Sequence, residues 1–237
     1  MTIQNSADSH FSAGSKSRLT EYDLPRFSGT TLFDRIARAV CRAGCLPRKE
    51  LYEAWEVARR TRRLFRGGRV VDLAGGHGLL ASMMLLLDDS SPTAIVVDTT
   101  MPSSAQKLTD SLEAEWPRLK NRVTFVEQAL ETIALDSHDV VVSSHACGAL
   151  TDVVLDRAIA AGARVAVLPC CHDLNDSPGG DLTGWIDGAL AMDVRRAERL
   201  RTNGYRVWTE TIPEAITPKN RLLMAGRTGS PPVPPRS

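Results

Sequence analysis

The stretch VVDLAGGHGLLA, residues 70–81, decides the fold, because a strand, a glycine-rich turn and a helix follow one another within it. Its first four residues, ending at Leu73, include a run of apolar side chains that is typical of a strand buried in a parallel sheet. Gly76 and Gly78 allow the backbone to turn sharply and to approach a ligand closely. Asp72, near the end of the strand, is placed to accept hydrogen bonds from a ligand. The stretch therefore predicts a ligand-binding turn at the end of a buried strand.

Strand-like and helix-like segments alternate beyond this turn. This alternation predicts an α/β fold with a doubly wound, mostly parallel, seven-stranded sheet that helices cover on both faces. No helix separates the last two strands, which indicates an antiparallel strand near one edge. The expected strands span 69–75, 93–100, 122–129, 138–146, 164–171, 205–212 and 221–227, and the expected helices 78–89, 103–116, 151–162 and 182–204.

The ends of the chain differ in composition from its middle. Residues 1–30 are rich in Ser, Thr and Asn, and residues 228–237 are rich in Pro, so we expect both to be disordered and outside any core. Residues 31–66 have apolar side chains at helical spacing and predict a basic helical cap over the active-site face of the domain at 67–227. The polar N-terminus and the short apolar stretch at 78–87 predict a cytoplasmic protein without a secretory signal or membrane span.

A second acidic residue follows the turn at a useful distance. Asp98 ends the second expected strand, twenty residues after Gly78, where a carboxylate can bind both hydroxyls of a ribose. The turn lacks the third glycine of the dinucleotide pattern G-x-G-x-x-G, which disfavours a nicotinamide oxidoreductase. The turn also lacks the Lys-Ser/Thr pair of nucleoside-triphosphate-binding loops.

The pattern Asp-x-x-x-Gly-x-Gly, followed by an acid at the end of the next strand, resembles that of class I S-adenosylmethionine-dependent methyltransferases. The resemblance covers residues 66–227 and implies the strand order 3-2-1-4-5-7-6, with S-adenosylmethionine as the cofactor. It implies that the glycine turn and its aspartate hold the methionine part, that the second acid holds the ribose, and that the third-strand turn flanks the adenine. The cofactor-binding residues predicted in this way are Asp72, Gly75, Gly76, Gly78, Asp98, Gln128 and Ser143.

Two short stretches, SSHACGALTD at 143–152 and LPCCHD at 168–173, hold three of the five cysteines and two of the five histidines. They follow strands four and five, which are neighbours in the class I order, so we expect them to meet on the acceptor side of the donor site. They resemble a branch of the fold that includes the thirteenth yeast-type tRNA 2′-O-methyltransferase and the glutathione S-transferase C-terminal-domain-containing proteins. The late segment ITPKNRLL at 216–223 also resembles that branch.

Several chemical roles fit these cysteines and histidines. Adjacent Cys170 and Cys171 point to opposite sides of a continuing strand, which disfavours a shared zinc ion, and we predict no metal site. A cysteine attacking a pyrimidine ring is a second interpretation, and buried structural thiols are a third. We favour an acceptor pocket with His145 or His172 as the general base. The predicted catalytic residues are His145, Cys147 and His172.

Positive charge gathers in the segment 31–69, which carries eleven basic and four acidic residues in a chain of net charge +1. Such asymmetry can mark a face that binds polyanions. With the tRNA-enzyme resemblance it favours an RNA acceptor, a hydroxyl or amine of tRNA or rRNA, although aromatic residues are few. A small-molecule acceptor and a non-catalytic nucleoside-binding protein are the alternatives. The predicted RNA contacts are Arg59, Arg60, Arg62, Arg63 and Arg66.

Overall fold

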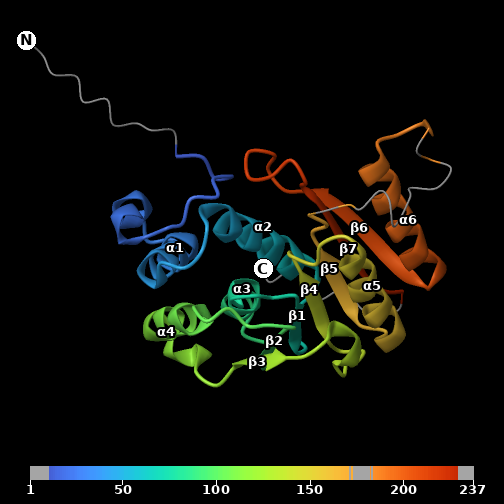
Figure 1. Ribbon diagram of the computed structural model, residues 1–237. Helices are drawn as coiled ribbons and strands as arrows, with labels where there is room; N and C mark the ends of the chain where they lie inside the picture. Colours follow the sequence, from blue (N-terminus) through green and yellow to red (C-terminus); the bar gives the residue numbers. More distant parts are fainter. Residues whose placement is uncertain (1–10, 171, 173–181, 183, 229–237) are drawn as a thin grey trace, which may run out of the picture.

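The computed structural model describes residues 11–170, 172, 182 and 184–228, and Figure 1 shows their arrangement. A central sheet is covered by helices on both faces. The strands are β1 (Val70–Leu73), β2 (Ala94–Asp98), β3 (Val123–Glu127), β4 (Val140–Ser143), β5 (Arg164–Val167), β6 (Tyr205–Thr211) and β7 (Arg221–Arg227). The α-helices are α1 (Leu32–Ala43), α2 (Arg48–Leu64), α3 (Leu79–Leu87), α4 (Ala105–Glu115), α5 (Ala149–Ala161) and α6 (Gly188–Thr202). Short 3₁₀ helices are η1 (Glu21–Phe27), η2 (Pro117–Leu119) and η3 (Leu130–Thr132).

The sheet has the order β3-β2-β1-β4-β5-β7-β6, which confirms the predicted fold class. The first five strands are parallel, and β7 runs antiparallel to both β5 and β6. In this register Asp72 of β1 lies beside Val96 of β2 and Val142 of β4. The carboxyl ends of these strands therefore meet at one edge of the sheet, where ligands bind in this class of fold.

The two faces of the sheet bury different helices. Alternate residues of a strand point to opposite faces, so Val70 joins the core shared with α1, α2, α3 and α4. Its neighbour Val71 joins the core beneath α5 and α6. Local signals set both ends of α1: the Thr31 hydroxyl accepts a hydrogen bond from the Asp34 backbone amide at 3.1 Å, and the helix ends at Gly44 in the left-handed conformation.

The expectation that residues 1–30 join no core is wrong for residues 11–30. Leu19 and Phe27 are buried in the same core as α1 and α2. The Leu19 amide donates to the Leu46 carbonyl at 2.9 Å, and the ring of Phe11 contacts that of Phe27 at 5.9 Å between centroids. A few large apolar side chains bury this segment although its average composition is polar. Residues 1–10 and 229–237, also predicted to be disordered, lie outside the described residues.

The five arginines at the end of α2 share three carboxylates within the chain. Each of the five has a carboxylate partner, and Arg62 is only 2% exposed, so its prediction as an RNA contact is wrong. The side chain of Arg62 also donates to the Met84 carbonyl at 3.0 Å and to the Ser91 hydroxyl at 2.8 Å. The ion pairs join Arg59 to Glu56, Arg60 to Glu56 and Glu210, Arg62 to Asp88, Arg63 to Glu210, and Arg66 to Asp88.

No helix in the described ranges combines the length and the apolar composition that crossing a membrane requires.

Replacing Arg62 by Ala should lower the free energy of unfolding by about 3–5 kcal/mol, because Asp88 would remain buried without its partner. Replacing Arg63, whose ion pair with Glu210 is exposed, should lower it by about 1 kcal/mol or less. Urea denaturation followed by circular dichroism measures both changes. Equal, small losses in the two variants would contradict a structural role for Arg62.

Candidate functional site

The glycine turn between β1 and α3 is held by backbone and carboxylate hydrogen bonds. The Gly75 amide donates to the Val97 carbonyl at 3.3 Å, and the Gly78 amide donates to the Gly75 carbonyl at 2.9 Å. Oδ2 of Asp98 accepts from the Gly76 amide at 3.1 Å. Asp98 thus both ends β2 and fixes the middle of the turn.

The glycines of the turn serve different purposes. A Cβ on Gly75 would lie 2.7 Å from Val96, and one on Gly78 would lie 3.0 Å from Phe125 and Val96, so both positions are closed by packing. A Cβ on Gly76 would meet nothing within 4 Å, and its φ of +50° lies in the region that favours glycine. Gly76 therefore presents bare backbone to open space, as a close approach by a ligand requires.

Asp72 lies beneath the turn rather than on its surface. Its side chain is buried, and Oδ2 accepts from the Ala81 amide in the first turn of α3 at 3.1 Å. Burial raises the pKa of this carboxyl to about 7, and the nearby charge of Asp98 also raises it. Its observed contact supports the turn, and its binding of the methionine part remains a prediction.

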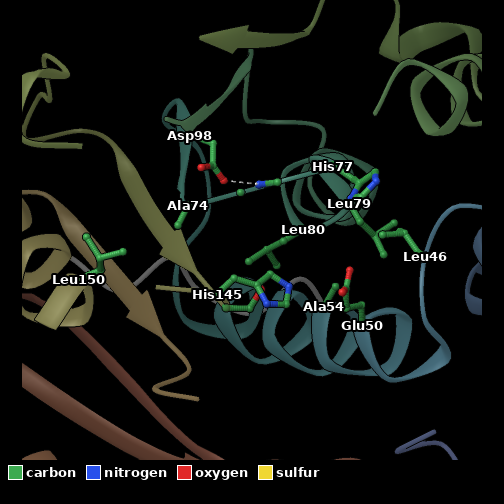
Figure 2. A pocket seen from close by; sticks show the side chains of 13 residues that line it. Leu46, Glu50, Ala54, Ala74, His77, Leu79, Leu80, Asp98, His145 and Leu150 are labelled. Carbon is green, nitrogen blue, oxygen red and sulfur yellow. Dashed lines mark hydrogen bonds between the residues drawn. The ribbon is translucent and has the colours of Figure 1, made fainter. Parts of the chain in front are cut away.

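A cavity of about 290 Å³ opens above the turn (Figure 2). Its walls are the glycine turn, the end of β2, the turn after β4 and the first half of α2. Of the predicted site residues, Gly75, Gly76, Asp98 and His145 line it. The full lining is Leu46, Glu50, Ala54, Ala74, Gly75, Gly76, His77, Leu79, Leu80, Asp98, Ser144, His145 and Leu150.

Glu50 and His77 line the cavity and were not predicted. Burial raises the pKa of the Glu50 carboxyl, and the neighbouring His145 partly offsets this. Burial also lowers the pKa of His77, as do the charges of Arg18 and His145, and Nε2 of His77 lies 2.8 Å from the Ser104 hydroxyl. Glu50 lies on a separate helix, before the glycine turn, and belongs to no sequence motif that could have identified it. His77 lies between two glycines of the turn, and this position could have identified it as a cavity residue.

Four predicted cofactor-binding residues lie outside the cavity lining: Asp72 and Gly78 in the support of the turn, and Ser143 and Gln128 at the ends of other strands. Ser143 is buried, and its hydroxyl accepts from the Ala146 amide at 3.2 Å, so it shapes the turn after β4 while Ser144 faces the cavity. The backbone amide of Gln128 donates to the backbone carbonyl of Asp98 at 3.0 Å, which places this residue beside the end of β2. An adenine contact by the Gln128 side chain remains a prediction.

The two cysteine-bearing stretches meet at the ends of β4 and β5, as expected. The sulfur atoms of Cys147 and Cys170 lie 2.9 Å apart. Neither residue lines the cavity, so the nucleophilic interpretation finds no support in their placement. Within the described ranges no three or more His, Cys, Asp or Glu side chains are grouped to hold a metal ion. Cys171, part of the zinc alternative, is outside those ranges.

His172 lies away from the cavity, in an ionic network between α6 and β7. Nε2 of His172 lies 2.9 Å from Oδ1 of Asp193, which also contacts Arg196 at 3.1 Å. Oδ2 of Asp193 accepts from Arg221 at 2.7 Å. His172 is absent from the cavity lining. Of the two histidines predicted as the general base, the cavity therefore favours His145.

Comparison with known proteins places this geometry in a family. Residues 50–176 match the family model described as a methyltransferase domain. The glutathione S-transferase C-terminal domain-containing protein homolog of Drosophila pseudoobscura pseudoobscura is 35% identical over 149 residues. That match covers 63% of this chain and only 23% of the relative's length.

Solved structures share the fold at low sequence identity. An O-methyltransferase family protein from Burkholderia thailandensis is 20% identical, with a TM-score of 0.50 over 91% of this chain and 66% of its own. Mitomycin 7-O-methyltransferase is 20% identical, with a TM-score of 0.50 over 89% of this chain and 64% of its own. Precorrin-6y C5,15-methyltransferase from Geobacter metallireducens is 15% identical, with a TM-score of 0.50 over 73% and 87%.

Replacing Asp72 by Asn should reduce the loss of stability that accompanies rising pH. Because the pKa of Asp72 is about 7 when folded and near 3.8 when unfolded, folding favours the protonated form, and stability falls as pH rises from about 4 to 7. The asparagine carries no charge and keeps an acceptor for Ala81. The melting temperature of the variant minus that of the native chain should therefore increase by roughly 5–10 °C between pH 5 and pH 8.

Thermal denaturation at the two pH values measures this difference, with Asp110→Asn on the exposed side of α4 as the control. Parallel pH profiles for the native chain and Asp72→Asn would contradict the buried-carboxyl interpretation.

Proposed function

Because the chain belongs to the methyltransferase-domain family that it matches over residues 50–176, we propose that it transfers a methyl group from S-adenosylmethionine to a hydroxyl or amine. One observation carries the proposal. The open backbone of Gly76, the carboxylate of Asp98 and the imidazole of His145 all face a single cavity. These groups supply a close backbone approach, a ribose acceptor and a base in one place.

The residues present fit the donor. Asp98 would hold the ribose hydroxyls, and Gly75 and Gly76 would pass closely beneath the methionine part. When bound, S-adenosylmethionine supplies a methyl group on a positively charged sulfur, which makes it ready for direct displacement. The apolar side chains of Leu79 and Leu80 line the same cavity and would limit the access of water to it.

His145 would take the proton of the acceptor. In the proposed step the carbon–sulfur bond breaks as the carbon–oxygen or carbon–nitrogen bond forms, and the acceptor proton passes to the imidazole. The carboxylate of Glu50, which is close enough to interact electrostatically with His145, would stabilise the resulting positive charge. In-line positioning of the acceptor by the cavity walls would supply much of the remaining acceleration.

The acceptor class is the finer part of the proposal. The resemblance to tRNA enzymes supports RNA, whereas the internal ion pairs of the predicted arginines do not support binding through that surface. None of the five arginines lines the cavity, and Arg62 lies eight residues beyond Ala54, the last lining residue on α2, which is about 12 Å along the helix. We propose an acceptor that inserts a single hydroxyl or amine, with RNA and small molecules as the two classes to test.

Replacing Asp98 by Ala should weaken the binding of S-adenosylhomocysteine by about 10- to 100-fold, because charged hydrogen bonds to the ribose are lost. Isothermal titration calorimetry measures this affinity. Asp98→Asn keeps the shape and one acceptor oxygen and should give a smaller loss, while Asp110→Ala on α4 serves as the control. A native chain that binds NAD in preference to S-adenosylhomocysteine would overturn the proposed function.

Replacing His145 by Ala should lower methyl transfer by about 100-fold or more, as expected for loss of a general base. The assay incubates the protein with labelled S-adenosylmethionine and either total cellular RNA or a small-molecule extract, and the labelled fraction identifies the acceptor class. His138→Ala replaces an exposed histidine remote from the cavity lining and should keep full activity. Equal activity of the two variants would exclude His145 as the base.

A further inference from the structure

The mouth of the cavity carries a group of basic side chains that the proposed reaction does not use. Figure 2 shows Leu46 and His77 together on one side of the cavity, whereas Leu150 lies on the opposite side. His77 follows Gly76 in the glycine turn, and Leu46 belongs to the turn between α1 and α2. This side of the mouth is therefore where the N-terminal segments meet the glycine turn.

Arg18 is fixed beside this part of the mouth by its backbone. It pairs with Pro47 in an isolated β-bridge. The flanking hydrogen bonds run from the Leu19 amide to the Leu46 carbonyl and from the Arg48 amide to the Ser17 carbonyl, both at 2.9 Å. The burial of Leu19 anchors the segment, while the Arg18 side chain stays exposed.

The charges of Arg18 and Lys107 converge on the same spot. Both lower the pKa of the Cys45 thiol, which burial raises, and Arg18 also lowers the pKa of His77. Lys107 is exposed on the first turns of α4, a helix that packs against α1. Two segments distant in sequence therefore bring positive charge to the α1–α2 turn.

These cations differ from the arginines at the end of α2. Across the part of the chain that the structure describes, no ion pair within 4.0 Å joins Arg18 or Lys107 to a carboxylate, whereas Arg59 and Arg63 each have one. The carboxylate of Glu50 also acts on the Cys45 thiol, and it interacts as well with His145, Glu53 and Lys49. Arg18 and Lys107 are thus available to an anion from outside the chain.

We propose that Arg18 and Lys107, with His77, form an anion-binding subsite at the mouth of the cavity that takes a carboxylate or phosphate group of a bound reactant. The inference rests on the proposed function, since the subsite adjoins the donor cavity. Two sources share this chemistry: the carboxylate of the donor's methionine part and a phosphate of the acceptor. An arginine fork suits either group, because it makes paired hydrogen bonds to two oxygens.

The surroundings of the subsite favour an anion over a cation. His77 has a lowered pKa and is therefore largely uncharged at neutral pH, so its ring and the Ser104 hydroxyl offer hydrogen bonds without adding charge. The net charge comes from Arg18 and Lys107. An incoming anion would be attracted by both of these positive charges.

Calorimetry on the full chain tests the subsite with three probes. S-adenosylhomocysteine carries the carboxylate, 5′-methylthioadenosine lacks it, and inorganic phosphate is titrated into the complex with S-adenosylhomocysteine. The variants are Arg18→Ala, Lys107→Ala and Arg18→Lys, with Lys120→Ala as a control that removes one exposed charge near the start of β3. Because Arg18 and Lys107 are exposed, unchanged circular dichroism spectra are expected for every variant.

If the donor carboxylate is the ligand, Arg18→Ala weakens S-adenosylhomocysteine about tenfold or more, leaves 5′-methylthioadenosine unchanged, and Arg18→Lys recovers part of the loss. If an acceptor phosphate is the ligand, Arg18→Ala leaves both nucleosides unchanged and abolishes phosphate binding. Variants that match the native chain with all three probes overturn the subsite. A native chain that binds neither nucleoside overturns the proposed function instead, so the two failures are distinguishable.

Discussion

The glycine turn depends on two carboxylates at the ends of adjacent strands. Asp98 accepts a hydrogen bond from the amide of Gly76, and Asp72 accepts one from the amide of Ala81. Because β1 and β2 are paired in parallel register, the sheet itself sets the spacing of these two anchors. The chain's own hydrogen bonds therefore hold the open backbone at Gly76, and the cavity above the turn is preorganised.

Helix α2 connects this cavity to the far side of the molecule. Its first half supplies Glu50 and Ala54 to the cavity wall, while its last turn inserts Arg62 beside Asp88, under the end of α3. A helix anchored by a buried ion pair at one end cannot move freely at the other, since the pair would lose its partner. We therefore regard α2 as a fixed wall of the site. Within this basic segment, the charge of Arg62 serves that anchoring.

Local patterns predicted the sheet and the donor end of the site, and long-range contacts decided the rest. The strand, the glycines and the acid between Asp72 and Asp98 lie close together in sequence, so their spacing and the family resemblance together predicted their arrangement. The pairing of Arg63 with Glu210 and of His172 with Asp193 depends on elements that only the folded sheet brings together. Glu50 lacked any motif, and the burial of Leu19 was hidden by its polar neighbours.

This difference between local and long-range determinants also explains why the fold does not identify the methyl acceptor. The donor end uses β1, β2 and the turn between them, which the structurally similar methyltransferases share as a fold at 20% identity or less. The opposite end uses Glu50 from α2, His145 from the turn after β4, and Leu150, which is 42% exposed on α5. These side chains come from segments free to vary without disturbing the sheet. The acceptor is therefore determined by the side chains that this chain itself contributes to the cavity, and not by the fold.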